Sequence, residues 1–248
     1  MINLKITDGI GMLEITMNSM GRETKIYPTL IWNKNSALLI DTGLPNSISK
    51  IKTAVENQGV PFKNIETLII THQDIDHFGG ANEIVQEIVN IKVRAHKEDI
   101  PYIQGEKRLV RLNSKFMDGL SNLPEEQKEK VLDMFENNPV MVDNDISDTE
   151  KLDCFGGIIV IHTPGHTPGH VCLYHEPSKT LIAGDALNIS EGKLVGPNLQ
   201  ILTDEDGKTA LNSLEKLDNY DIDNVVSYHG GFFKNATNQT ITDLVGEK

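Results

Sequence analysis

The feature that most constrains the fold is an apolar run that ends directly in a crowded polar segment. Residues 65–70 are IETLII, and residues 71–80 are THQDIDHFGG, so two histidines and two aspartates occupy six positions. Such a cluster costs free energy in a core unless its groups are paired or bind a ligand. A helical pattern, ANEIVQEIV, resumes at residue 81. The pattern predicts a buried strand, apolar on both faces, whose terminal loop aims side chains into a site.

The same arrangement recurs at other strand ends. A predicted strand ends in an acidic or histidine side chain beside glycine or a turn at Asp41, His166, Asp185 and His229. Imidazole nitrogen and carboxylate oxygen together suit zinc, and also iron or manganese. The segment 72–77 is too short for one regular element to direct all four of its groups to one ion. Two coordination centres therefore fit the segment better than one.

The order of elements predicts two β-rich halves, each covered by helices. Short β-type runs are expected at 2–6, 11–17, 25–33, 36–41, 65–70, 91–96, 156–163, 170–176, 180–187 and 224–231. Helical patterns are expected at 47–59, 81–89, 203–218 and 237–246. Thr203 is a candidate N-cap with Asp206 three residues on. The layers would be α/β/β/α, and residues 1–248 would form a single domain.

Residues 97–140 differ from the rest of the chain. They are rich in Lys, Glu, Asn and Gln, with a helical stretch at EEQKEKVLDMFENN. This composition predicts a helical insertion. An insertion of this length forms a lid or substrate wall, or else packs against the domain or makes a dimer contact.

Charge and cysteine content restrict the partners. The formal net charge of −13 argues against binding to nucleic acid or to an anionic membrane, because both require a basic surface. The N-terminal residues have no apolar signal-peptide core, and no apolar stretch reaches the length of a membrane helix. Cys154 and Cys172 form no CxxC pair, which favours a reducing compartment. We expect a cytoplasmic protein with a small-molecule substrate, and a homodimer stays open.

Together these motifs make the resemblance specific. The chain resembles the metallo-β-lactamase-fold hydrolases, whose pattern is an early Asp, an HxHxDH loop, a His in a TPGH turn, a bridging Asp and a late His. The matching stretches in this sequence are Ile40 to Gly43, His72 to His77, Thr163 to His166, Gly184-Asp185 and Tyr228 to Gly230. The match covers residues 41 to 229 in the family's order. It implies an αββα sandwich of two mixed β-sheets face to face, with helices outside.

The resemblance also implies a role for each site residue. His72, Asp74 and His166 would hold a first metal ion. Asp76, His77 and His229 would hold a second one. Asp185 would bridge the two ions, and Asp41 would brace the metal loop without binding metal. Of the remaining histidines, His170 is expected to be structural, and no site role is expected for His96, His162 or His175.

One residue departs from the family's pattern. Asp74 stands where the common motif has histidine, and a carboxylate is a harder donor that adds negative charge. Two divalent ions are expected. Zinc is the commonest metal in the family, and Asp74 moves the preference toward iron or manganese. The alternative is that Asp74 does not contact the metal, so that the first site is weak or empty.

The resemblance implies hydrolysis by a hydroxide bound to a dinuclear metal centre, with an ester-type bond as the target. Asp76 or a metal-bound water would return the proton to the leaving group, and Asp185 would bridge the metals. The short GDAL segment is similar to that of the lactonase branch, so a lactone is favoured, although that branch has a tyrosine where this chain has Asn188. Thioester and phosphodiester hydrolysis are alternatives within the class. A diiron redox protein and a non-catalytic ligand-binding protein are alternatives outside it.

Overall fold

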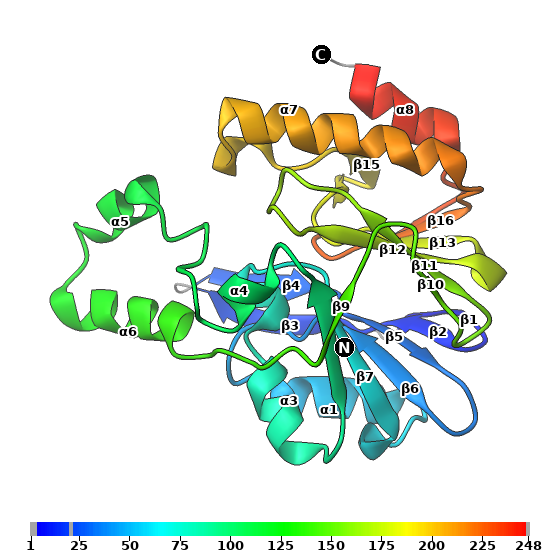
Figure 1. Ribbon diagram of the computed structural model, residues 1–248, viewed down its shortest axis with the longest axis horizontal. Coiled ribbons are helices and arrows are strands. Elements are labelled where there is room, and N and C mark those ends of the chain that lie inside the picture. Colours follow the sequence, from blue (N-terminus) through cyan, green and yellow to red (C-terminus); the bar gives the residue numbers. More distant parts are fainter. Residues whose placement is uncertain (1–3, 20–21, 247–248) are drawn as a thin grey trace.

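The computed structural model describes residues 4–19 and 22–246. Two β-sheets lie face to face, with helices α1 (Ile48–Asn57) and α3 (Ala81–Glu87) outside one sheet and α7 (Asp204–Ser213) and α8 (Asn238–Gly246) outside the other (Figure 1). The predicted αββα sandwich is confirmed.

The first sheet has seven strands in the order β1-β2-β5-β6-β7-β8-β9. Its strands are β1 (Leu4–Thr7), β2 (Ile10–Met12), β5 (Thr29–Trp32), β6 (Ala37–Ile40), β7 (Ile65–Ile70), β8 (Lys92–His96) and β9 (Asn144–Ile146). The pairs from β6 to β9 are parallel, and the pairs from β1 to β6 are antiparallel. The sheet is therefore mixed, and the parallel strands β6 and β7 end at the same edge.

The second sheet has six strands in the order β10-β11-β12-β13-β16-β17. Its strands are β10 (Lys151–Leu152), β11 (Ile158–His162), β12 (Val171–His175), β13 (Thr180–Ile182), β16 (Asn224–Ser227) and β17 (Gly231–Lys234). The β13–β16 pair is parallel and the other pairs are antiparallel. Two separate hairpins complete the strands, namely β3 (Ile15–Ser19) with β4 (Arg22–Ile26) and β14 (Asn188–Ser190) with β15 (Lys193–Val195).

Three buried apolar clusters correspond to the three interfaces between layers. Residues of the first sheet pack with α1 and α3, as Leu39 does with Ile51 and Ile84. A second cluster joins the inner faces of both sheets. A third joins the second sheet to α8 and to the 3₁₀ helix η4 (Leu214–Asn219). Burial on both faces of each sheet fixes the strand register, and hence where each strand ends.

Most predicted elements are present, with local corrections. The helix predicted at 203–218 is α7 followed by η4, and the Thr203 side chain accepts a hydrogen bond from the Asp206 amide as an N-cap should. The runs 11–17 and 25–33 each contain a break between two strands, and residues 2–3 lie outside the described residues. The prediction that β7 is buried on both faces is wrong at its start, where Glu66 is exposed.

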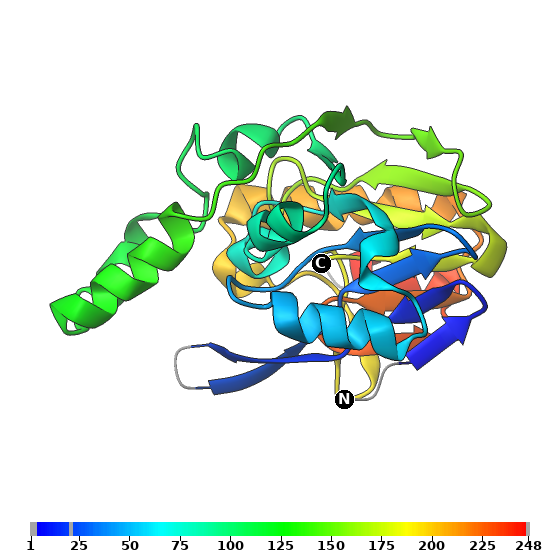
Figure 2. The same cartoon turned by 90° about the horizontal axis from the view of Figure 1, so that it is seen from below.

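Residues 97–140 contain three helices, α4 (Ile100–Ile103), α5 (Ser114–Leu120) and α6 (Glu125–Glu136). In both views α5 and α6 project to one side of the sandwich (Figures 1 and 2). No residue of α6 is fully buried, although Leu132 and Phe135 pack partly against the first apolar cluster. Among the described helices, none is long and apolar enough to cross a membrane.

Candidate metal centre

Loops from both sheets bring the predicted ligands together. The segment 71–78 follows β7 and includes the short helix α2 (Ile75–Phe78), while His166 lies in the loop between β11 and β12. Asp185 follows β13 and His229 follows β16. Three groups have ligand atoms within 4.8 Å of one another: His72, Asp74 and His166; His72, His77 and Asp185; Asp76, His77 and His229. All seven predicted ligands therefore converge at one end of the sandwich.

Asp185 lies between the two predicted metal subsites. Its Oδ2 is 3.3 Å from His166 Nε2, which belongs to the first subsite. Its Oδ1 is 3.2 Å from His77 Nε2 and 3.4 Å from His229 Nε2, which belong to the second. The two carboxylate oxygens thus face different sets of imidazoles, which is the arrangement that a bridging ligand requires.

Asp41 fixes the loop that follows β7 through hydrogen bonds to Thr71 and His77. Its Oδ1 accepts a hydrogen bond from the Thr71 amide at 2.8 Å, and its Oδ2 accepts one from Thr71 Oγ1 at 2.7 Å. His77 Nδ1 lies 2.9 Å from Asp41 Oδ2, which leaves His77 Nε2 directed at Asp185. Asp41 adopts a left-handed backbone conformation with φ of 63°. Asp41 is therefore placed to orient a ligand rather than to act as one.

The electrostatics of the cluster suit a cation. Burial lowers the pKa of His77, but the carboxylates of Asp185 and Asp41 outweigh burial and raise that pKa well above its usual value. Burial raises the pKa of Asp185, and the neighbouring His229, His77 and His166 more than offset it, so that the pKa lies well below its ordinary value. The carboxylates thus stay ionised and favour positive charge beside them.

Unsatisfied buried atoms support the same conclusion. Among the described residues, buried side-chain atoms without a hydrogen-bond partner include His72 Nε2, Asp74 Oδ1, His77 Nε2 and Asp185 Oδ1. Buried polar atoms normally have a hydrogen-bond partner, so several unpaired ones in a single cluster indicate a bound ligand. Imidazole nitrogens and carboxylate oxygens are ligands for divalent metals. The donor set fits a metal centre.

His170 stabilises the centre without taking part in it. Its Nε2 accepts a hydrogen bond from the Asp185 amide at 3.0 Å, so its Nδ1 carries the proton that faces Thr163 Oγ1 at 2.8 Å. Gly184, with φ of +51°, leaves room for this contact, because a Cβ there would lie 2.7 Å from His170 Nε2. Both ring nitrogens are therefore used, which agrees with the structural role predicted for His170.

The three remaining histidines lie in other contacts. His96 stacks on His162 with ring centroids 3.9 Å apart. His175 Nδ1 is 2.6 Å from Ser178 Oγ, and its Nε2 is 3.0 Å from the Phe155 carbonyl oxygen. These contacts account for the three side chains without a role in the centre.

Two residues of the insertion reach the centre, and sequence reasoning missed both. Asp99 is buried and accepts hydrogen bonds from the Gln73 amide, from Thr167 Oγ1 and from the Gly169 amide, which ties the loop containing His72 to the loop containing His166. Arg111 donates from Nε to Asp74 Oδ2 at 2.8 Å. Both partners are far away in sequence, and no local pattern marks either residue.

The nearest tyrosines do not replace the one missing at Asn188. Tyr228 packs on His77, but its hydroxyl donates to the Asp76 carbonyl oxygen at 2.5 Å and accepts from the Gly43 amide at 3.1 Å. Burial is the main cause that raises the pKa of Tyr228 well above its usual value. Tyr174 donates to the Asp221 carbonyl oxygen. Both hydroxyls are committed to backbone, so neither is placed to act as a general acid.

A pocket of about 590 Å³ opens beside the centre. Its polar lining residues are Asp74, Asp76, Arg111, Asn113 and Lys115. Its apolar wall comes mainly from the insertion, with side chains contributed by Phe116, Leu120, Leu123 and Phe135. The insertion and the metal ligands thus line one space.

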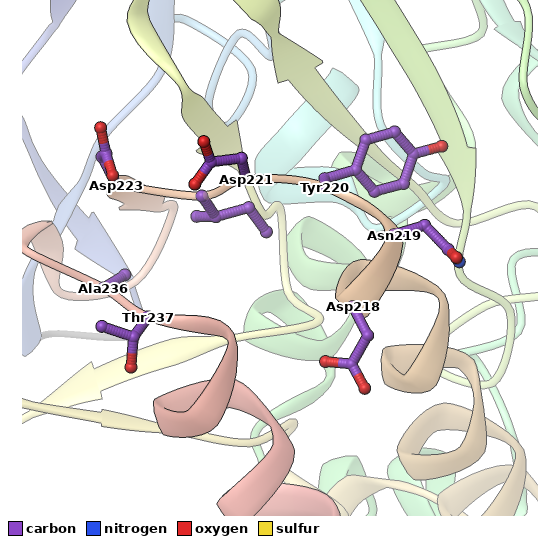
Figure 3. Close-up of a pocket in the computed structure, with 8 residues that line it drawn as sticks. Asp218, Asn219, Tyr220, Asp221, Asp223, Ala236 and Thr237 are labelled. Atoms are coloured by element: carbon purple, nitrogen blue, oxygen red, sulfur yellow. The ribbon is translucent and has the colours of Figure 1, made fainter.

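Another pocket lies away from these ligands, between the loop after η4 and the start of α8 (Figure 3). Its lining is acidic, and Asp221 pairs with Lys179 at 2.5 Å. Its eight lining residues include no histidine and no cysteine. The centre described above is therefore the better candidate for catalysis.

The sequence model of the metallo-beta-lactamase superfamily matches residues 22–229. The chain belongs to this superfamily. It is 25% identical over 210 residues to the probable metallo-hydrolase YflN of Bacillus subtilis (strain 168), covering 79% of this chain and 76% of YflN. It is 26% identical over 161 residues to the hydroxyacylglutathione hydrolase GloC of Haemophilus influenzae, covering 64% of this chain and 65% of GloC.

The fold is also that of solved members of the superfamily. A metallo-beta-lactamase family protein from Thermus thermophilus aligns with a TM-score of 0.74 and 22% identity, covering 98% of this chain and 80% of that one. This likeness establishes the fold. The resemblance inferred from residues 41 to 229 is thus confirmed at the level of the superfamily.

Proposed function

We propose that this chain is a metal-dependent hydrolase that cleaves an ester-type bond, with a lactone as the favoured substrate. The observation that carries the proposal is the convergence of four imidazoles and three carboxylates, with Asp185 between the two halves of the set. In this proposal His72, Asp74 and His166 hold one ion, Asp76, His77 and His229 hold the other, and Asp185 bridges them. When bound, two divalent ions would provide a hydroxide nucleophile near neutral pH and polarise the ester carbonyl.

Asp76 is the residue proposed to move the proton. It lies at the pocket, with 29% of its side chain exposed, and its Oδ2 is 3.3 Å from His229 Nε2. Burial raises the pKa of Asp76, but the hydrogen bond from His229 and the charge of His77 outweigh burial, so that the pKa lies below its ordinary value. Asp76 is therefore ionised at neutral pH. It can accept the proton that water loses when the hydroxide forms and pass that proton to the leaving alcohol.

The pocket supports a substrate with an apolar group. The wall formed by Phe116, Leu120 and Phe135 faces the same space as Asp74 and Asp76. A lactone with an acyl chain would place its ring at the ligands and its chain along this wall, and the insertion 97–140 would act as the substrate wall. Thioester hydrolysis is the second candidate, favoured by the relatedness to GloC, a hydroxyacylglutathione hydrolase.

The test is hydrolysis of a lactone, a thioester and a bis-aryl phosphodiester by the wild-type protein and by Asp185→Asn. We expect turnover of the lactone series to rise with acyl length and to be lost in Asp185→Asn, because an amide cannot bridge two cations as a carboxylate does. Asp118→Asn, an exposed position in the insertion, is the control and should keep full activity. Preference for the thioester would replace the lactone assignment, and absence of turnover on all three would contradict the proposal.

A further inference from the structure

Arg111 lies directly against two of the predicted ligands of the first subsite. It lies between α4 and α5, and only 14% of its side chain is exposed. Its Nε donates to Asp74 Oδ2 at 2.8 Å, and its Nη2 lies 2.8 Å from His166 Nε2. The same His166 nitrogen lies 3.0 Å from Asp74 Oδ2, so the guanidinium, the carboxylate and the imidazole form one compact cluster. Two atoms that would hold the first ion are thus in contact with a guanidinium.

Further contacts hold this arginine in place. Nη2 also donates to the His166 carbonyl oxygen at 3.0 Å, and Nη1 donates to the Ile201 carbonyl oxygen, in the 3₁₀ helix η3 (Leu199–Ile201), at 3.4 Å. All three guanidinium nitrogens are thus engaged. Because this many hydrogen bonds hold the planar guanidinium in one orientation, Arg111 is an ordered part of the site.

The first subsite differs from the second in this respect. Asp74 Oδ2 and His166 Nε2 are two of the three donors of the first subsite, and both contact Arg111. Asp76, His77 and His229 have no lysine or arginine ion pair among the described residues. A metal ion at the first subsite would lie beside the guanidinium, and the two positive charges would repel each other at short range.

We propose that Arg111 makes the two metal subsites unequal, so that the chain binds one divalent ion tightly at the second subsite and a second ion only weakly at the first. This inference rests on the proposed function, because it takes the same residues as ligands. It also explains why Asp74 replaces the family's histidine. A carboxylate pairs with the guanidinium, whereas an imidazole would leave that charge without a counterion. Asp74 and Arg111 therefore act as a matched pair.

The size of the effect follows from how often Arg111 leaves the subsite. If the guanidinium is displaced in about 1–10% of molecules, the apparent affinity for the second ion falls by about ten- to a hundredfold. Replacing Arg111 by glutamine removes the charge and should raise the affinity for the second ion by the same factor. Arg108→Gln is the matched control, because Arg108 lies in the same segment, is 51% exposed and pairs with Glu136 away from the centre.

The experiment is calorimetric titration of the chelator-treated protein with Zn²⁺, with bound zinc counted by elemental analysis. Wild type and Arg108→Gln should bind one equivalent tightly and a second about ten- to a hundredfold more weakly. Arg111→Gln should bind two equivalents with more nearly equal affinities. Two equal tight sites in wild type, or an unchanged second site in Arg111→Gln, would overturn the inference and leave the proposed function standing. No zinc binding by wild type would overturn the inference, and no binding of Zn²⁺, Mn²⁺ or Fe²⁺ would overturn the proposed function as well.

Discussion

Asp99 provides a sharp test of how the centre is assembled. It is 1% exposed, and its carboxylate accepts four hydrogen bonds: from the Gln73 amide and Gln73 Nε2, both at 3.0 Å, from Thr167 Oγ1 at 2.6 Å and from the Gly169 amide at 2.8 Å. Gln73 lies between His72 and Asp74, and Thr167 follows His166. Removing the carboxylate therefore releases both ligand loops from each other.

The expected cost follows from these contacts. Buried hydrogen bonds to a charged group contribute about 1.5–3 kcal/mol each, and breaking a buried charged network by removing one member costs about 3–5 kcal/mol in total. For a domain of this size, that corresponds to a fall in Tm of about 6–20 °C for Asp99→Ala. Asp99→Asn should also destabilise, although it keeps the shape, because all four partners donate and the amide would turn an NH₂ group toward two of them. Loosened ligands should lower metal affinity by at least about tenfold.

The assay combines thermal and urea unfolding with metal titration. Asp118→Ala, at an exposed position in the insertion, is the control and should leave both quantities unchanged. A free energy of unfolding within about 1 kcal/mol of wild type for Asp99→Ala, with unchanged metal affinity, would refute this account of the two loops.

Two further predictions concern residues near the centre. Tyr228→Phe should lose about 1–2 kcal/mol of stability, because it leaves the Gly43 amide and the Asp76 carbonyl without a partner. The same substitution should lower kcat less than tenfold. A larger loss of kcat at unchanged KM would make the tyrosine a general acid. Burial and then the charge of His162 lower the pKa of His96 to about 4. The His96 imidazole of the unfolded chain binds a proton below about pH 6.5, so the free energy of unfolding should fall as the pH drops from 6.5 to 4. Urea titrations at both pH values should show that His96→Phe removes about 1–3 kcal/mol of this pH dependence.

The parts of the fold that the sequence predicted are those set by local patterns. The apolar run at 65–70, the helical spacing of Ile51 and Ala54, and the cap at Thr203 each act through neighbours within a few residues. The short strands β9, β14, β15 and β17 had no such pattern, since runs of three or four residues are stabilised by their partners in the sheet.

The residues of the site also divide into those marked by local motifs and those placed only by long-range contacts. The predicted ligands come from motifs at strand ends, and the structure brings all seven together. Arg111 contacts His166, 55 residues away, and Asp99 contacts Gly169, 70 residues away, from a segment whose composition is ordinary for a helical surface. Their roles depend on the path of the insertion across the sandwich. The departure at Asp74 was visible in the sequence, but its partner was visible only in three dimensions.

The central claim is that hydrolysis at this centre depends on divalent metal. The most direct measurement is turnover of the substrate preferred by wild type, before chelation, after removal of metal, and after titration with Zn²⁺, Mn²⁺ or Fe²⁺. Turnover should disappear with the metal, return with added ion, and stay absent in Asp185→Asn. Turnover that persists after bound metal has been removed, as verified by elemental analysis, would contradict it.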